Sequence, residues 1–309
     1  TSVRNKLLAM ALLPLLVVFP LLVLAIAVWS SVTYDRLLIT KVRSDLAVAR
    51  GYFDQTLAEV GSGTRGVARS QRLLQAMAGG DLQAQLAADR QELGLDFLLL
   101  VRHDDPRPAL PASVSALLPR LTGAPGRAAQ IVRLSRDELA ALAPQLLPRL
   151  NIPLVTTRNA APDARSVEDR ALVLLALQPV QDVSGQPLAL LVGGLLLNQN
   201  LDFIDHINRI VYPDDALPFG SRGTATLFLD DVRITTNVRL FQDLRAIGTR
   251  VSQTVRDTVL TEGTTWLDRA FVVNDWYVSA YDPLTDAQGR RIGMLYVGFT
   301  EAPFILLRY

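Results

Sequence analysis

Residue types that carry enzyme chemistry are scarce in this sequence. The chain has 309 residues, with no cysteine and only two histidines, His103 and His206. The lack of cysteine excludes thiol catalysis, disulfides and cysteine-based metal sites. His103 stands in the stretch VRHDDP, where neighbouring side chains on a turn cannot easily aim at one ion, and His206 has no partner in the sequence. We therefore predict no catalytic residue, no metal site and no cofactor.

Hydrolase and nucleotide-binding motifs are also missing. No G-x-S-x-G motif occurs, and the carboxylate pairs Asp214–Asp215 and Asp230–Asp231 are adjacent, so that in a strand they point to opposite faces. The stretch GSGTRG at residues 61–66 lacks the Lys-Ser/Thr pair of a phosphate loop and is predicted to be a break or a flexible patch in a long helix. With a net charge of +1, the chain shows no sign of a nucleic-acid partner. The residues present are not expected to form an enzyme.

Aromatic and arginine side chains in the second half of the chain predict a ligand pocket instead. Of the 20 aromatic residues, 13 follow His206. A small-molecule pocket needs apolar and aromatic walls with a few polar groups that orient the ligand. The candidate ligand-binding residues are Arg233, Asn237, Trp266, Arg269, Phe271, Tyr277 and Tyr281.

The pattern of these residues suggests the class of ligand. Strand alternation puts Arg269 and Phe271 on one face of their strand, and Tyr277 and Tyr281 on one face of the next, without showing that both are the same face. An arginine in a pocket favours a carboxylate or phosphate through a bidentate contact. The alternative is that the aromatic residues form the core and the arginines a solvated rim.

The elements that position these residues begin with a predicted membrane segment. Residues 7–29 carry no charge, and as a helix of about 1.5 Å per residue they exceed the roughly 30 Å hydrocarbon core of a bilayer. A signal peptide would have a shorter apolar region and a small-residue cleavage site. Arg4 and Lys6 precede the segment and the next basic residue is Arg36, which predicts a cytoplasmic amino terminus. The residues after the segment are then periplasmic or extracellular.

A long helix is predicted to follow the membrane segment. Apolar and small residues recur there at alternating steps of three and four, which is typical of one buried helical face. They are Ile39, Val42, Leu46, Ala49, Phe53, Thr56 and Val60. The stripe indicates a helix that packs on its own domain, or one that also pairs with the same helix in a homodimer. Residues 32–92 are assigned to this stalk and to the first helices of the next domain.

An internal repeat predicts two tandem domains. Residues 176–195 (ALQPVQDVSGQPLALLVGGL) and 280–299 (AYDPLTDAQGRRIGMLYVGF) share five residues at a constant spacing of 104 positions. A further match, between residues 168–174 and 267–273, has a spacing of 99. We infer two copies of a sheet with helical cover, at residues 93–205 and 206–304.

The second copy has the clearer pattern of elements. Residues 224–238 predict a hairpin that turns at Asp230–Asp231, and residues 243–263 predict an amphipathic helix. Three more strands follow up to Phe299. This order predicts an α+β fold whose second unit has a five-stranded antiparallel sheet. In the first unit we expect a short helix at residues 135–143, and a further helix at residues 200–211.

The chain resembles the double Cache sensor region of bacterial receptors, in which two PAS-like domains follow a membrane helix and a long extracytoplasmic helix. The resemblance to the membrane-proximal Cache domain of sensor histidine kinases is strongest in FLDDVRITTNV, AIGTRVSQTVRDTVL, WLDRAFVVNDWYVSAYDPLTDAQGRRIGMLYVGF and EAPF. It implies a periplasmic sensor of a small ligand, anchored as a dimer in the bacterial inner membrane. Two alternatives to a sensor histidine kinase remain. The chain could be the input region of a chemoreceptor or diguanylate cyclase, or a membrane-anchored module that binds a protein partner.

Two departures from that family qualify the resemblance. Amino-acid-sensing double Cache proteins carry a cluster of Tyr, Arg and Trp-Tyr in the membrane-distal domain, whereas residues 93–205 contain no Tyr or Trp. This argues against an amino-acid ligand in the first unit. The family also continues into a second membrane helix and a catalytic core, and we expect residues 305–309 to begin that second membrane segment.

Overall fold

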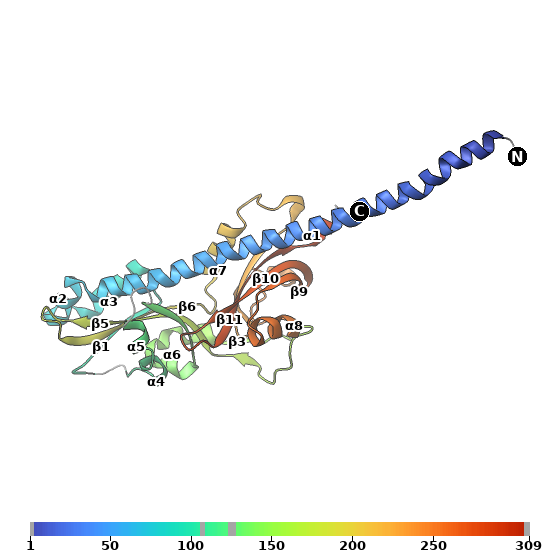
Figure 1. Cartoon of the computed structure of the whole chain (residues 1–309). Helices are drawn as coiled ribbons and strands as arrows, with labels where there is room; N and C mark the ends of the chain where they lie inside the picture. Colours follow the sequence, from blue (N-terminus) through green and yellow to red (C-terminus); the bar gives the residue numbers. More distant parts are fainter. Residues whose placement is uncertain (1–2, 106–108, 123–127, 306–309) are drawn as a thin grey trace.

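One long helix, α1 (Val3–Ala68), extends through the whole molecule. The computed structural model describes residues 3–105, 109–122 and 128–305. At about 1.5 Å per residue, the 66 residues of α1 extend over roughly 100 Å. The N-terminal part of α1 projects alone, and its second half lies along both sheets (Figure 1). Among the described residues, α1 is the one helix long and apolar enough to cross a membrane, and the predicted segment 7–29 lies in its projecting part.

The predicted break at residues 61–66 is wrong, because α1 continues without interruption to Ala68. Gly61 instead allows the helix to approach the first sheet, since a Cβ at this position would lie 2.7 Å from the Cβ of Ala128. Two shorter helices complete the predicted helical region, α2 (Gln71–Gly79) and α3 (Leu82–Leu93).

The first unit contains a four-stranded antiparallel sheet in the order β1-β6-β5-β2. Its strands are β1 (Phe97–Arg102), β2 (Ala129–Leu134), β5 (Ala171–Gln181) and β6 (Pro187–Leu196). The remaining elements of this unit are α4 (Ala112–Ser115), α5 (Leu118–Thr122), α6 (Arg136–Leu142), the 3-10 helix η1 (Pro144–Leu150) and the two-stranded β3 (Ile152–Pro153) and β4 (Val167–Glu168). The predicted short helix at residues 135–143 is confirmed as α6, which a capping box of Ser135 and Glu138 begins.

The second unit contains the predicted five-stranded antiparallel sheet, in the order β8-β7-β11-β10-β9. Its strands are β7 (Gly223–Leu229), β8 (Val232–Thr236), β9 (Trp266–Val272), β10 (Asp275–Thr285) and β11 (Arg291–Thr300). Helix α7 (Leu201–Val211) runs through the predicted boundary at residues 205/206 and packs on β7 and β8. Short elements follow at η2 (Pro218–Gly220), η3 (Phe241–Asp243), α8 (Gln253–Arg256), the π-helical turn η4 (Asp257–Thr261) and α9 (Ala302–Ile305).

The predicted amphipathic helix at residues 243–263 is wrong over its first half. Only α8 and η4 are helical, because the preceding residues pair in extended form with β8. Arg233 donates its backbone N–H to Thr249 (2.9 Å), and Val251 donates to Asp231 (3.0 Å). A free strand edge offers unpaired backbone groups, and this pairing satisfies them at the expense of helix formation.

The two units repeat the same hairpin in atomic detail, as the 104-residue spacing predicts. Asp182 closes the β5–β6 turn by accepting the backbone N–H of Ser184 and of Gln186, and Asp286 accepts the equivalent N–H groups of Gln288 and Arg290. The match at a spacing of 99 does not survive, because residues 168–174 lie in β4 and the start of β5. The counterpart of β9 is β2, which pairs with β5 as β9 pairs with β10.

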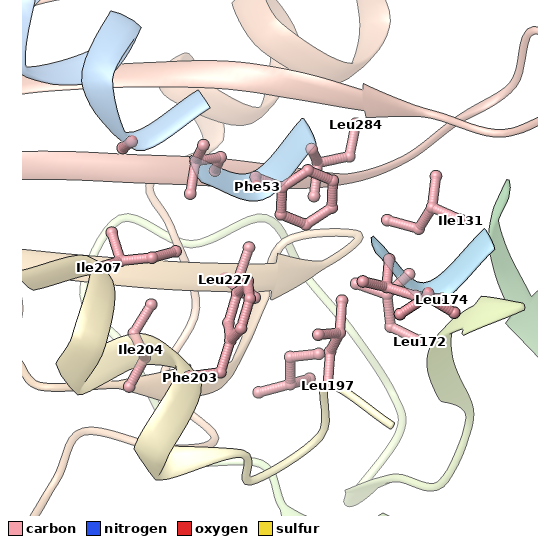
Figure 2. Packing of buried hydrophobic residues seen from close by; sticks show 14 of the residues in the cluster. Phe53, Ile131, Leu172, Leu174, Leu197, Phe203, Ile204, Ile207, Leu227 and Leu284 are labelled. Atoms are coloured by element: carbon pink, nitrogen blue, oxygen red, sulfur yellow. The ribbon is translucent and has the colours of Figure 1, made fainter. Parts of the chain in front are cut away.

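A shared hydrophobic core joins both sheets to α1. Figure 2 shows Phe53 of α1 among side chains of the first sheet, the second sheet and α7. The labelled core residues are Phe53, Ile131, Leu172, Leu174, Leu197, Phe203, Ile204, Ile207, Leu227 and Leu284. Five residues of the predicted helical stripe are buried here, namely Val42, Leu46, Ala49, Phe53 and Val60. The stripe therefore packs on the chain's own domains.

Truncation of Phe53 should weaken both units together. Replacing a buried Phe by Ala typically costs about 3–5 kcal/mol, and Phe53 is 2% exposed within the shared core. Val48→Ala is the matched control on the opposite face of α1, where Val48 is 45% exposed, and it should change stability by less than about 0.5 kcal/mol. Chemical denaturation of the full chain in detergent measures both. Equal effects of the two substitutions would contradict a core centred on α1.

Candidate functional site

The register of the sheet divides the predicted site residues between two faces. Tyr277 of β10 lies directly opposite Ala270 of β9, and Val278 lies opposite Arg269. Directly opposed residues of an antiparallel pair share a face, so Tyr277 and Arg269 point in opposite directions. Tyr281 shares the face of Tyr277, which is turned away from α1, whereas Arg269 faces the α1 side. The predicted set is therefore not one pocket.

Arg233 is the centre of the face turned away from α1. Its side chain is 1% exposed, and its guanidinium lies 4.9 Å from the ring centroid of Phe228. Nη1 donates to the hydroxyl of Thr249 (3.1 Å), while Nε has no hydrogen-bond partner within the part of the chain that the structure describes. Among the described residues, no carboxylate forms an ion pair with Arg233. A buried charge without a counter-charge is energetically costly, and burial accordingly lowers the pKa of Arg233.

Three tyrosines surround this arginine. Tyr281 and Tyr296 pack with ring centroids 4.7 Å apart, and the Tyr296 hydroxyl is 3.0 Å from the hydroxyl of Thr224. Burial raises the pKa of Tyr281 to about 12, and the Arg233 charge opposes this shift. Burial also raises the pKa of Tyr277 and of Tyr296. The Tyr281 hydroxyl lies beside the Arg233 guanidinium and has no acceptor among the described residues, so a buried donor and a buried cation both remain available to a ligand.

Sequence reasoning missed Tyr296, although it lies directly opposite Tyr281. Counting outward from the turn that Asp286 and Arg290 close would put Leu295 opposite Tyr281. A register shift between Leu284 and Thr285 moves the pairing by one residue. A shift of one residue exchanges the two faces of a strand, so this irregularity alone puts Tyr296 on the same face as Tyr281 and Arg233.

A cleft of about 800 Å³ lies beside the cluster. The predicted residues Asn237 and Tyr277 line it, together with Thr224. Asn237 also accepts the backbone N–H of Ala225 through Oδ1 (2.7 Å), which holds its amide at the cleft wall. Four arginines and three aspartates contribute to the lining, and they are Arg209, Arg222, Arg239, Arg245, Asp205, Asp243 and Asp275. Tyr277 and Thr224 thus connect the cleft with the buried tyrosines.

The other three predicted residues have different surroundings. Arg269 forms ion pairs with Asp35 of α1 (2.9 Å) and with Glu301, which follows β11. Phe271 packs edge-to-face with the exposed Trp276 at a centroid distance of 5.7 Å. Trp266 is on the same face of the sheet as Arg233 but at the start of β9. Its indole N–H donates there to the carbonyl of Asp268 (3.3 Å). Among the described residues, no group of three or more His, Asp or Glu side chains is arranged to hold a metal ion.

Residues 238–262, here called the cover segment, lie over the face of the second sheet that carries Arg233. Its buried members pack directly on Phe228 and the tyrosines, and they are Val238, Ala246, Val251, Val255 and Val259. An arm of the first unit, residues 153–161, holds the cover segment in place. Val155 donates its N–H to Gly248 (2.9 Å), and Arg250 donates its N–H to the Thr157 hydroxyl (2.9 Å). At Gly248 a Cβ would lie 2.1 Å from a carbonyl oxygen of the arm, and its φ of 87° also favours glycine.

A continuous chain of ion pairs runs from β2 to α8 along this contact. Each arginine in it bridges to a carboxylate, with separations between 2.6 and 3.9 Å. The arginines are Arg133, Arg165, Arg170, Arg250 and Arg256, and the carboxylates are Asp163, Glu168, Asp230 and Asp231. The hydrogen bonds from Arg165 lower the pKa of Asp163 to about 2. The first unit is thereby tied to the segment that covers Arg233.

Residues 195–308 match the family model described as Single cache domain 3. The match covers the second unit, which is called the Cache unit below. The match begins at the end of β6 and includes α7 and the whole five-stranded sheet. The expected resemblance to a Cache sensor region is confirmed, with the arginine cluster and the cleft inside the Cache unit.

Solved structures of bacterial sensor domains are also similar to the chain. The periplasmic domain of Vibrio cholerae LuxQ is 12% identical, with 84% of this chain and 99% of that chain covered and a TM-score of 0.46. The sensor domain of the V. cholerae histidine kinase DctB is 11% identical, with 85% and 97% covered and a TM-score of 0.38. The ligand-binding domain of the Pseudomonas aeruginosa PAO1 chemoreceptor PctB, in complex with L-Arg, is 12% identical, with 88% and 90% covered and a TM-score of 0.36. No curated protein matches the sequence significantly.

Removal of the buried charge should stabilise the protein in the absence of ligand. Arg233→Met keeps an unbranched apolar stem, and Thr249 stays satisfied because its hydroxyl donates to the Ala246 carbonyl (2.6 Å). Apolar replacement of buried charges is often stabilising by about 1–4 kcal/mol. We expect a higher midpoint of chemical denaturation for Arg233→Met. The control Arg269→Met breaks two ion pairs and should lower it; a larger loss for Arg233→Met would show that Arg233 is a structural residue.

The ion-pair chain should make stability sensitive to acid. The pKa of Asp163, about 2 in the folded chain, is below its ordinary value near 4, so its contribution is fully present above pH 4 and lost as the pH falls through 2. Asp163→Asn should remove on the order of 1 kcal/mol at pH 6, after allowance for solvent screening. Its difference from wild type should shrink as the pH approaches 2. Urea denaturation at several pH values tests this, with the exposed Asp169→Asn as control; a constant difference would contradict it.

Proposed function

We propose that the chain is the extracytoplasmic sensing module of a membrane-bound sensor histidine kinase, and that its Cache unit binds a small anion, most simply a carboxylate. The observation that carries the proposal is the complete burial of Arg233 without a carboxylate partner among the described residues. A bound carboxylate would supply the missing counter-charge through a bidentate contact with the guanidinium. The Cache family match of residues 195–308 supports a sensing role for the same unit.

The ligand reaches Arg233 from the cleft. Tyr277 and Thr224 form the wall between them, and Tyr296 and Tyr281 continue inward from Thr224. The Tyr281 hydroxyl, which has no acceptor among the described residues, is placed to donate to the same anion. Ligand binding then requires the cover segment or Tyr277 to shift, because the arginine is closed in without ligand. A ligand that binds the shifted arrangement more tightly would change the balance between the two states.

Arg269 links the Cache unit to the membrane side instead of contacting the ligand. It joins the edge strand β9 to Asp35 near the projecting part of α1 and to Glu301 at the end of β11. A shift of the sheet would therefore be felt both by α1 and by the segment that leaves β11. We place α1 in the inner membrane, with its amino terminus in the cytoplasm and both units in the periplasm. We also propose that the protein is a homodimer. Helix α7 is assigned to the second domain because it packs on β7 and β8.

A thermal-shift screen of the full chain in detergent tests the proposed ligand class. The probes are short mono- and dicarboxylates, inorganic phosphate and the uncharged amides of the same carbon skeletons. A ligand at a hundred times its Kd should stabilise the protein by about 2.7 kcal/mol. We expect one or more carboxylates to raise the melting temperature of wild type and of Arg269→Met. Neither the matching amide, nor any probe added to Arg233→Met, should do so.

Three results would overturn this assignment. Stabilisation of Arg233→Met by the same carboxylate as wild type would place the anion elsewhere. Equal stabilisation by a carboxylate and its amide would show that charge is not recognised. Loss of the shift in Arg269→Met, with retention in Arg233→Met, would move the ligand to the opposite face of the sheet.

A further inference from the structure

Three aromatic side chains gather at the end of the Cache unit from which α1 projects. Trp276 is 52% exposed, Phe219 is 61% exposed, and Phe271 is half-buried against Trp276. We call these three residues the aromatic foot. Exposure of large aromatic rings to water is unfavourable. Several of them at one end of a unit therefore indicate a surface that contacts a partner.

Contacts on both sides of the foot connect it to the same turn of α1. Glu301 donates its N–H to the Trp276 carbonyl (3.0 Å), and the Glu301 side chain pairs with the arginine that also binds Asp35. On the other side, Phe219 packs edge-to-face on Phe304 at 6.1 Å, and Phe304 lies 6.4 Å from the ring of Tyr34. The foot is therefore level with residues 34–35 of α1. In Figure 1 the Cache unit is the part of the molecule next to the projecting helix.

This level lies at the outer edge of the headgroup layer of a bilayer. The predicted membrane segment ends at Trp29, and Asp35 is six residues further, or roughly 9 Å along a helix. The headgroup region adds about 5–8 Å to each side of the hydrocarbon core. Indole rings favour this layer because they combine an apolar body with an N–H donor. An exposed Trp276 side chain at this height can reach it.

Two apolar residues at this end of the unit have a left-handed backbone conformation. Phe219 has a φ of 60°, and Val273, at the tip of the β9–β10 hairpin beside Trp276, also has a φ of 60°. Such conformations are ordinarily taken by Gly or Asn, and they are unusual for β-branched residues. A tight turn in water would gain from Gly or Asn at these positions. Val273 is held there by packing on the buried cluster that contains Phe228 and the tyrosines, whereas Phe219 stays 61% exposed and would gain a partner from contact with lipid.

We propose that the aromatic foot rests in the headgroup layer of the same bilayer that α1 spans, so that the Cache unit lies on the lipid surface as well as being anchored to it. The inference rests on the membrane anchor of the proposed function. Carboxylates at the foot outnumber the arginine that pairs with them, since Arg269 faces both Asp35 and Glu301 and Asp275 accepts the backbone N–H of Trp276, so a zwitterionic surface suits the foot better than an anionic one. The partner is a zwitterionic phospholipid surface, recognised by burial of aromatic rings.

Fluorescence quenching in vesicles tests the proposal with the chain's own tryptophans. The full chain contains Trp29, Trp266 and Trp276, and Phe at two of these positions leaves one reporter. Each single-tryptophan variant is reconstituted into phosphatidylcholine vesicles, with and without lipids brominated near the headgroup. Trp276 should lose most of its emission in the brominated vesicles. Trp266 should not, because it is five residues from Phe271 along β9, or roughly 17 Å.

The Trp29 variant separates the foot from the anchor. Quenching of Trp29 and Trp276, but not of Trp266, supports the proposal. Quenching of Trp29 alone overturns the foot and leaves the membrane anchor in place. Quenching of neither overturns both together, and quenching of all three shows unfolding on the lipid or burial of the whole unit, which also contradicts a foot. Circular dichroism of each variant confirms that the fold is intact before the comparison is made.

Discussion

The packing of one stripe of α1 against two sheets is the contact on which the rest of this structure depends. Val42, Leu46, Ala49, Phe53 and Val60 are buried within a core that contains residues of both sheets and of α7. Neither sheet covers its inner face without the helix, and the helix has no other partner for its apolar stripe among the described residues. Because an α-helix is a stiff rod, the two units share one fixed axis that leads directly to the projecting apolar segment.

Two arginines of the Cache unit show how the environment of a side chain decides its role. Arg269 has two carboxylates and joins the sheet to α1 and to the segment after β11. Arg233 has none among the described residues and lies under a segment that the first unit holds in place. We expect the first arginine to stabilise the unit and the second to weaken it in the absence of a ligand. A site that stores an unpaired charge trades stability for the ability to recognise an anion.

The repeated hairpin explains which parts of the site were predictable. Asp182 and Asp286 close equivalent turns, and both hairpins carry a register shift at the same place, after Val180 and after Leu284. The repeat and its turns are visible in the sequence because a tight turn requires particular residues at fixed positions. The register shift leaves no comparable mark. The sequence pattern therefore does not predict Tyr296 as a site residue, although it does predict Tyr281 and Arg233.

The sequence by itself determined the apolar segment, the long helix, the tandem α+β units and the five-stranded sheet, because hydrophobic period and turn residues are local properties. It also predicts a ligand site among the aromatic and arginine residues of the second unit. Only the tertiary structure decided that Arg233 is buried without a counter-charge and that Arg269 lies on the opposite face. Strand register and the pairing of residues 249–251 with β8 determine both outcomes, and these depend on contacts between residues far apart in the chain.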